Sequence, residues 1–560
     1  MDLSPSGSAA AELNGNNAAL HAANDTDATN AADNALASDG STLDVSAAAA
    51  PEESVAAPVV RRYTLHPAFR DLGLIGGTSI ITTAAAIAII SLLGRYLGPA
   101  LLGEYLLVRR IASWMQSVVA LPSGIALPRY VAASVNESQI NKRSYFLPAF
   151  FIGSAMALVI SICLIVGRST LGRFLLGSGD FTHLLVPIAV TVIGLAIHGV
   201  VFGYYQGDLA MIRASAVQTI NIAVVPVTCA VFLWRFHSIA LIVDATGVAM
   251  IAISCLFALP ILFGMTARVA FAGFPARSRE LMTYGASRTV GDFGLQGLLS
   301  LPAIIAAHFL PIAAVSSLLL GGSFLGVVSV ATLPLGLILL SRVARSLATN
   351  RSAELRERII HFMGALIELS AFITLQMLVF SDVILRAWVG PRFLSGLVVV
   401  QIAILTMPFY FAHSGLRSLV DAGAIKAYNS LNIVIALIAF LVASAAVCVT
   451  MRSSAHFLEA LAFCGMFGLA VLSCLTWRTT EKLFEVKPTW TKILPGLTLA
   501  IALGVASYGL KRLFAAHMGL PLVAGIEVLI GLAYFVGLHF MRVQWLIFVR
   551  ETALPGFARK

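Results

Sequence analysis

The most informative chemical pattern in the sequence is a stripe of polar side chains inside an apolar stretch. Its members recur at every fourth position: Tyr284, Arg288, Asp292, Gln296 and Ser300. Residues four apart share one face of a helix, so the spacing predicts a single polar face. We interpret it as the wall of a watery cavity in which Arg288 faces an anion, with Asp292 and Gln296 beside it. A buried intrahelical pair of Arg288 with Asp292 is the alternative.

A second cationic feature lies in an earlier apolar stretch. Arg109 and Arg110 stand roughly 9 Å in from Gly103, at 1.5 Å per helical residue. Gln116 lies on the same helix face as Arg109. A charge within a bilayer costs about 2.5–3.5 kcal/mol, so it needs a partner or water. The planar guanidinium matches phosphate oxygens, which predicts a phosphate-binding site. Snorkelling to lipid headgroups is the alternative.

Two further polar features lie in apolar stretches. Glu368 is a lone acid, and such an acid is a candidate for proton or cation coupling. A structural hydrogen bond is the alternative for it. The hydroxyl side chains Thr78, Ser79, Thr82 and Thr83 form a run of small residues, which predicts close helix packing or a bend during gating.

The composition indicates which elements position these residues. Of the 560 residues, 59% are hydrophobic and 11% are charged, whereas soluble proteins carry about 25% charged residues. The bilayer must therefore be the solvent for most of the chain, and helices satisfy the backbone there. We predict an all-α polytopic membrane protein with about fourteen spans of about 20 residues, near 72–94, 103–134, 145–167, 183–205, 214–234, 239–266, 283–307, 312–340, 359–380, 397–420, 428–450, 456–477, 491–511 and 520–541.

The distribution of Lys and Arg predicts the topology. With the N-terminus inside, 25 of the 37 basic residues fall in inside segments, nine in outside segments and three within spans. Basic loops stay in the cytoplasm, so both termini are predicted there. Residues 1–60 hold nine acids and no Lys or Arg, and we predict a disordered cytoplasmic tail over 1–70. Basic residues beside apolar spans indicate lipid headgroups and topology rather than nucleic acid.

A weak internal repeat predicts the domain organisation. The segment Leu121–Leu127 is echoed by Leu333–Leu339, and chance similarity between Leu-rich helices is the alternative. A true repeat would give two six-helix bundles of the same orientation, 71–270 and 271–480, around a central cavity. The remaining 481–560 would add a helix pair and a cytoplasmic C-terminus.

Several motifs resemble those of a known transporter family. Gly94–Pro99, Gly103–Tyr105, Leu121–Gly124, Pro128–Tyr130 and the turn Asp421–Lys426 resemble Wzx-type oligosaccharide flippases. That family belongs with the multidrug and lipid-linked oligosaccharide exporters. The resemblance implies flipping of an undecaprenyl-pyrophosphate-linked oligosaccharide across the bacterial inner membrane by alternating access, for surface or exopolysaccharide synthesis. It implies as partners this lipid-linked substrate, membrane lipids and a polysaccharide polymerase. A cation-coupled multidrug antiporter of the same superfamily is the alternative function.

The sequence lacks the patterns that an enzyme of this class would need. It contains no HExxH, no GxSxG and no DxD in a loop, and no CxxC spacing occurs among the six cysteines. We therefore expect no catalytic residue, no metal and no cofactor, since function must be argued from a site.

Overall fold

The computed structural model describes residues 67–134, 142–263, 271, 273–326, 328, 332, 352–423, 426–514 and 519–541. All of them belong to one compact unit, Leu65–Lys560. Most of the predicted N-terminal tail lies outside the described residues, as do the second copy of the predicted repeat at 333–339 and the residues after 541.

The described part of the chain is built from helices, without a strand, and the chain is a multi-pass integral membrane protein. Twelve of its helices are long and apolar enough to cross a bilayer. One of them, Gly73–Val119, covers the first predicted span and the second as far as Val119, whereas the second was predicted to continue to residue 134. The eighth predicted span is represented by the shorter apolar helix Ile312–Gly326. The prediction of an all-α polytopic fold is confirmed.

A break in the first long helix, α2 (Pro67–Val119), separates those two predicted spans. Gly98 has φ 81° and ψ −175°, which is not helical. A residue with a Cβ rarely adopts this conformation, and glycine does so freely. Pro99 follows it and disfavours a helical conformation at the preceding residue. The Gly98-Pro99 pair therefore divides α2 into a first arm, 67–97, and a second arm, 99–119.

We use the name N-terminal bundle for α2 and the helices up to residue 263, and the name C-terminal bundle for α12 to α19, following their order in the chain. Within the N-terminal bundle α7 packs against both α5 and α10, and α2 packs against α7, α8 and α9. The second arm of α2 ends in a turn around Pro122, as the proline predicts. The further helices are α3 (Ala126–Ala133), α5 (Phe146–Val166), α6 (Arg168–Leu176), α7 (Leu185–Gly207), α8 (Met211–Thr219), the π-helical turn η3 (Ile220–Val224), α9 (Val225–Leu233) and α10 (Ile239–Phe263).

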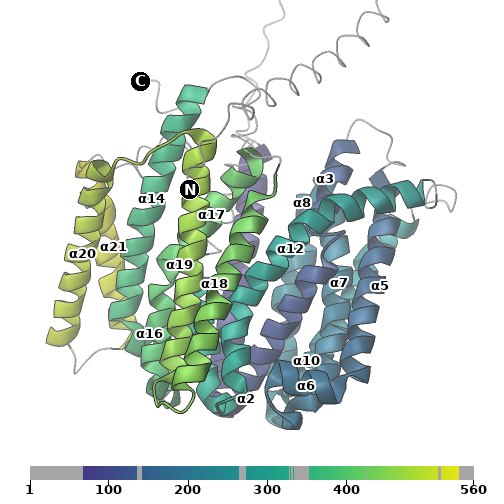
Figure 1. Ribbon diagram of the computed structural model, residues 1–560, viewed down its shortest axis with the longest axis horizontal. Coiled ribbons are helices and arrows are strands. Elements are labelled where there is room, and N and C mark those ends of the chain that lie inside the picture. Colours follow the sequence, from purple (N-terminus) through teal and green to yellow (C-terminus); the bar gives the residue numbers. More distant parts are fainter. Residues whose placement is uncertain are drawn as a thin grey trace, which may run out of the picture. The chain divides into compact units, whose positions relative to one another are not determined.

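The C-terminal bundle begins with α12 and is followed by a helix pair. Within the bundle α19 packs against α17 and α18, while α20 of the pair packs against α14 (Figure 1). The helices are α12 (Phe274–Ala307), α14 (Ser352–Val379), α15 (Ser381–Trp388), α16 (Leu397–Leu405), α17 (Met407–Gly423), α18 (Tyr428–Met451), α19 (Phe457–Phe484), and the pair α20 (Trp490–Leu513) and α21 (Leu520–Phe540).

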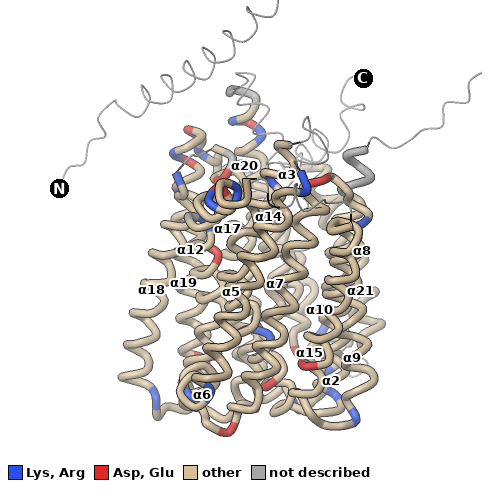
Figure 2. The backbone as a smooth tube through the Cα atoms, turned by 90° about the vertical axis from the view of Figure 1, so that its right-hand side faces the viewer, with Lys and Arg blue, Asp and Glu red and all other residues tan. Residues whose placement is uncertain are grey.

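The long helix α12 connects the two bundles. It contacts α2, α3 and α5 on one side, and α18 and α19 on the other. Figure 2 shows that charged residues gather toward the ends of the helices and are sparse along the middle. This distribution follows from the high cost of charge within a bilayer. The charged groups that do lie between the helix ends are therefore candidates for function.

Candidate functional site

A cavity of about 980 Å³ lies between the two bundles. Both arms of α2 line it, together with residues of α12, the helix Ile312–Gly326, α14, α15, α17 and α21. Its volume is near the upper end of the range of about 300–1,000 Å³ that ligand pockets occupy. The cavity is therefore large enough for a bulky head group.

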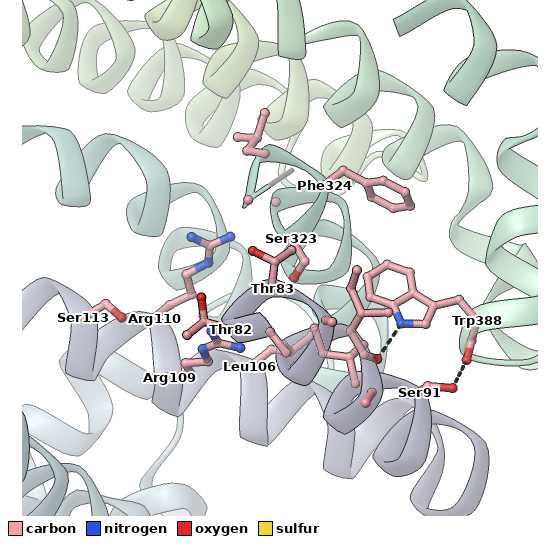
Figure 3. A pocket seen from close by; sticks show the side chains of 18 of the residues that line it. Thr82, Thr83, Ser91, Leu106, Arg109, Arg110, Ser113, Ser323, Phe324 and Trp388 are labelled. Carbon is pink, nitrogen blue, oxygen red and sulfur yellow. Dashed lines mark hydrogen bonds between the residues drawn. The ribbon is translucent and has the colours of Figure 1, made fainter. Parts of the chain in front are cut away.

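Two guanidinium groups project from the second arm of α2 into the region of this cavity. Arg109 and Arg110 both line it, and Figure 3 shows them together with Thr82 and Thr83 of the first arm. Neither guanidinium forms a hydrogen bond or an ion pair with a described residue. Two adjacent positive charges without a counter-charge favour an anion in the cavity, because such a ligand would relieve both their repulsion and their desolvation.

Close helix contacts position these arginines. Trp114 of α2 donates a hydrogen bond from Nε1 to the carbonyl oxygen of Phe293 on α12, at 3.1 Å, and its ring stacks on Phe293. Gly297 leaves room for the indole, since a Cβ there would lie 3.3 Å from Nε1. Gly322 likewise lets a guanidinium approach, because a Cβ there would lie 2.6 Å from Nη2 of Arg110.

Besides these two arginines, the lining holds further polar side chains among its apolar residues. Gln116 of α2 and Gln296 of α12 both line the cavity, as do Ser113 and Ser323. The described lining contains three arginines, of which Arg95 is the third, and no Asp or Glu. The cavity therefore offers positive charge, amide groups and hydroxyls, which suit phosphate and sugar oxygens.

Hydrogen bonds join α2 to α15 where both helices line the cavity. Ser91 donates a hydrogen bond to the carbonyl oxygen of Trp388 at 2.6 Å, and Trp388 Nε1 donates to that of Ile87 at 2.8 Å (Figure 3). Arg95 donates to the carbonyl oxygens of Ala387 and Trp388. These carbonyls belong to the C-terminal end of α15, where a cation is favourable.

Arg288 and Asp292 lie outside the lining of this cavity, unlike Gln296 on the same stripe. Asp292 accepts a hydrogen bond from Nη2 of Arg417 on α17 at 2.5 Å, and the described residues show no ion pair between Asp292 and Arg288, which was the alternative. The guanidinium carbon of Arg288 lies 4.5 Å from the ring centroid of Tyr284, and that of Arg129 lies 4.4 Å from the same centroid. The residues of the polar stripe therefore have different surroundings. Gln296 lines the cavity, whereas Asp292 contacts Arg417 of α17.

A polar contact joins α12 to the N-terminal bundle near the start of α5. Tyr145 donates a hydrogen bond from its hydroxyl to Glu280 at 2.9 Å, and Arg277 lies over its ring. Burial, together with the hydrogen bond to Glu280, raises the pKa of Tyr145 to about 12. Its hydroxyl therefore remains a neutral donor at physiological pH.

Glu368 lies on α14, away from the cavity lining. It is completely buried against the helix pair: a Cβ at Gly496 of α20 would lie 2.7 Å from its carboxyl carbon. The side chain predicted as a coupling candidate therefore lies at the interface with α20 and α21 and not in the cavity lining.

Sequence reasoning missed several lining residues. The hydroxyls of the first arm were interpreted as a sign of close helix packing or of a bend during gating, and neither interpretation includes the cavity that Thr82 and Thr83 line. A Cβ on the nearby Gly73, Gly76 or Gly77 would meet nothing within 4 Å, so this region is not closely packed within the described residues. The contacts of Arg95 with the carbonyl oxygens of Ala387 and Trp388 were also missed, because no local pattern pairs positions so distant in sequence.

Comparison with known proteins supports the fold. No protein-family profile matches the sequence, and no curated protein matches it either. A solved structure of the lipid II flippase MurJ, in an inward closed conformation, is similar with a TM-score of 0.64 and 11% identity, over 84% of this chain and 99% of that one. An inward-facing multidrug resistance MATE family transporter of the MOP superfamily is similar with a TM-score of 0.58 and 12% identity, over 72% and 95%. This chain therefore shares their fold.

Proposed function

We propose that this protein translocates a lipid-linked oligosaccharide of the undecaprenyl-pyrophosphate type across the bacterial inner membrane by alternating access, for surface or exopolysaccharide synthesis. Both termini would be cytoplasmic, in keeping with the bias of Lys and Arg. A polysaccharide polymerase would use the translocated unit. The protein would act as a transporter, with the membrane lipids as its surroundings.

The observation that carries the proposal is the charge of the cavity. Arg109 and Arg110 line it without a hydrogen-bonded or ion-paired partner among the described residues, and its described lining contains no acid. A pyrophosphate would supply the missing negative charge, and guanidinium groups bind phosphate oxygens through paired hydrogen bonds. Gln116 and Gln296 line the same cavity, and their amide groups would bind sugar hydroxyls.

The alternative is a cation-coupled multidrug antiporter, which the shared fold with a MATE family transporter favours. A lipophilic cation would need acids in the cavity. Asp292 is paired with Arg417 and Glu368 faces the helix pair, so neither acid supplies that charge. The charge of the cavity therefore favours the anionic cargo.

The test is a translocation assay in vesicles that contain the purified protein and a fluorescent undecaprenyl-pyrophosphate oligosaccharide. The double variant Arg109→Gln/Arg110→Gln should reduce the rate by about tenfold or more, because a hydrogen bond to a charged group contributes about 1.5–3 kcal/mol and 1.36 kcal/mol corresponds to tenfold. The variant Arg168→Gln, at an exposed residue of α6 outside the cavity lining, is the matched control and should retain the rate.

Two results would contradict the proposal. One is an unchanged translocation rate in the double variant. The other is transport of cationic dyes, with no movement of the lipid-linked sugar, by the unaltered protein, which would support the antiporter instead.

A further inference from the structure

The interface between α14 and the C-terminal helix pair encloses a carboxyl group. Glu368 has 0% of its surface exposed. Tyr534 of α21 donates a hydrogen bond to the backbone oxygen of Glu368 at 2.9 Å, and its ring stacks on Phe372 with 4.1 Å between the centroids. Gly496 of α20 lies directly against the carboxyl group. Both helices of the pair therefore contact Glu368, α20 at its carboxyl group and α21 at its backbone.

Neither oxygen of this carboxyl group has a hydrogen-bond partner in the described part of the chain. The hydroxyl of Tyr534 is committed to the backbone oxygen and supplies no donor to the carboxyl. Native proteins almost always pair buried polar atoms. Two unpaired oxygens on one fully buried side chain are therefore an exception that requires a physical account.

The ionisable groups of the neighbouring helices do not supply a counter-charge. Lys511 of α20 pairs with Asp382 at 2.6 Å. On α17, His413 bonds to Thr476 and Arg417 pairs with Asp292. The other ionisable side chains on the faces near this site are His361 on α14, the exposed Lys492 on α20, and the half-buried Glu527 on α21.

An ionised carboxylate without donors is very unfavourable in an apolar interior, and such a group becomes neutral instead. We propose that Glu368 is a proton-binding site, and that its bound proton holds the helix pair α20–α21 against α14. Loss of the proton would leave an uncompensated charge at the centre of the interface. Water could reach that charge only if the pair moved away from α14.

Other polar contacts join α14 to α20 in the same interface. Nearer to α15, Gln376 accepts a hydrogen bond from Ser507 at 2.7 Å, and Lys511 also donates to the backbone oxygen of Val379. The amide nitrogen of Gln376 also has no partner in the described part of the chain, but an amide is uncharged, whereas the carboxyl of Glu368 becomes charged when it loses its proton. The proton site lies outside the cavity, so its tests do not depend on the identity of the cargo.

The first measurement is infrared spectroscopy of the full chain in lipid vesicles at neutral pH. The spectrum of the unaltered protein minus that of Glu368→Gln should show the carbonyl band of a protonated carboxylic acid. Glu527 lies on α21, within the helix pair. The matched variant Glu527→Gln should retain that band. A difference spectrum with carboxylate bands in place of the acid band would overturn the proposal.

The second measurement follows the docking of the pair by disulfide formation. A Cβ at Gly504 of α20 would lie 3.4 Å from the Cβ of Leu375 on α14, close to disulfide geometry. The variant Leu375→Cys/Gly504→Cys would be made in a chain whose six native cysteines are replaced, once with Glu368 and once with Glu368→Gln. The two proteins have the same thiols, so the pH dependence of thiol oxidation cancels in the comparison.

As the pH is raised, the yield of the disulfide should fall several-fold in the protein with Glu368 relative to the protein with Glu368→Gln. Adding Glu527→Gln to the protein with Glu368 should leave the fall unchanged. Equal yields from the two proteins at every pH would overturn the role of the proton in docking. These readouts do not involve transport, so they separate this inference from the proposed flippase activity.

Discussion

Replacing Asp292 by Asn tests whether a single ion pair holds α12 against the rest of the C-terminal bundle. Arg417 lies on α17 and donates a hydrogen bond to Asp292 on α12 at 2.5 Å. Its Nε also lies 3.8 Å from Asp421, one turn further along α17. The substitution removes the negative charge of the nearer partner and retains the shape of the side chain.

The magnitude follows from the geometry of this pair. A hydrogen bond between charged groups contributes about 1.5–3 kcal/mol, and breaking a fully buried pair costs about 3–5 kcal/mol. The side chains of Arg417 and Asp292 are 30% and 35% exposed, so solvent screens the pair in part. Asp421 also remains as a weaker partner. We therefore expect Asp292→Asn to lower the free energy of unfolding by about 2 kcal/mol.

The assay is unfolding of the purified protein in mixed detergent micelles, as a double-mutant cycle with Arg417→Gln. The coupling energy should be at least about 1 kcal/mol, since residues in direct contact are not additive. Asp421→Asn is the matched control, and we expect it to cost about 0.3–0.5 kcal/mol, because its contact with Arg417 is longer, at 3.8 Å, and pairs one helical turn apart contribute about that much. Its amide oxygen can still accept the hydrogen bond from Asn429. Equal losses for the two variants, or strict additivity of Asp292→Asn with Arg417→Gln, would refute the reasoning.

Three further predictions concern the cavity, the bundle contact and the helix break. Gly322→Ala should slow translocation several-fold with a loss of stability below about 1 kcal/mol, because the added Cβ meets only the flexible end of Arg110; unchanged transport in the vesicle assay would count against it. Tyr145→Phe should lower the free energy of unfolding by about 0.5–1 kcal/mol through loss of the hydrogen bond to Glu280. Because the folded pKa of Tyr145 is raised to about 12, this contribution is fully present below the unfolded pKa near 10 and is lost as the pH rises through about 12; an effect that disappears between pH 6 and 9 in unfolding measurements would be inconsistent with that sign. Gly98→Ala should cost about 1–3 kcal/mol, because φ of 81° strains a residue with a Cβ; a midpoint of thermal unfolding equal to that of the unaltered protein would show that the break tolerates a side chain.

Much of the fold was predictable because membrane insertion imposes a local rule. Each span must be apolar over about 20 residues and must be helical, so the sequence marks most spans independently of their packing. The break between the first two spans was also encoded locally, by Gly98 followed by Pro99. Fewer properties of the site can be read from neighbouring residues in the sequence, because the helices that line the cavity come from every third of the chain.

The sequence by itself determined that the chain crosses the membrane many times as helices, and it identified Arg109 and Arg110 as charges that need a partner or water. The tertiary structure decided which polar groups meet. It brought Gln116 and Gln296 to the same cavity, paired Asp292 with Arg417, and buried Glu368 beneath the helix pair. The physical reason is that insertion energy depends on each residue alone, whereas the partner of a charge depends on helix rotation and on contacts between residues hundreds of positions apart.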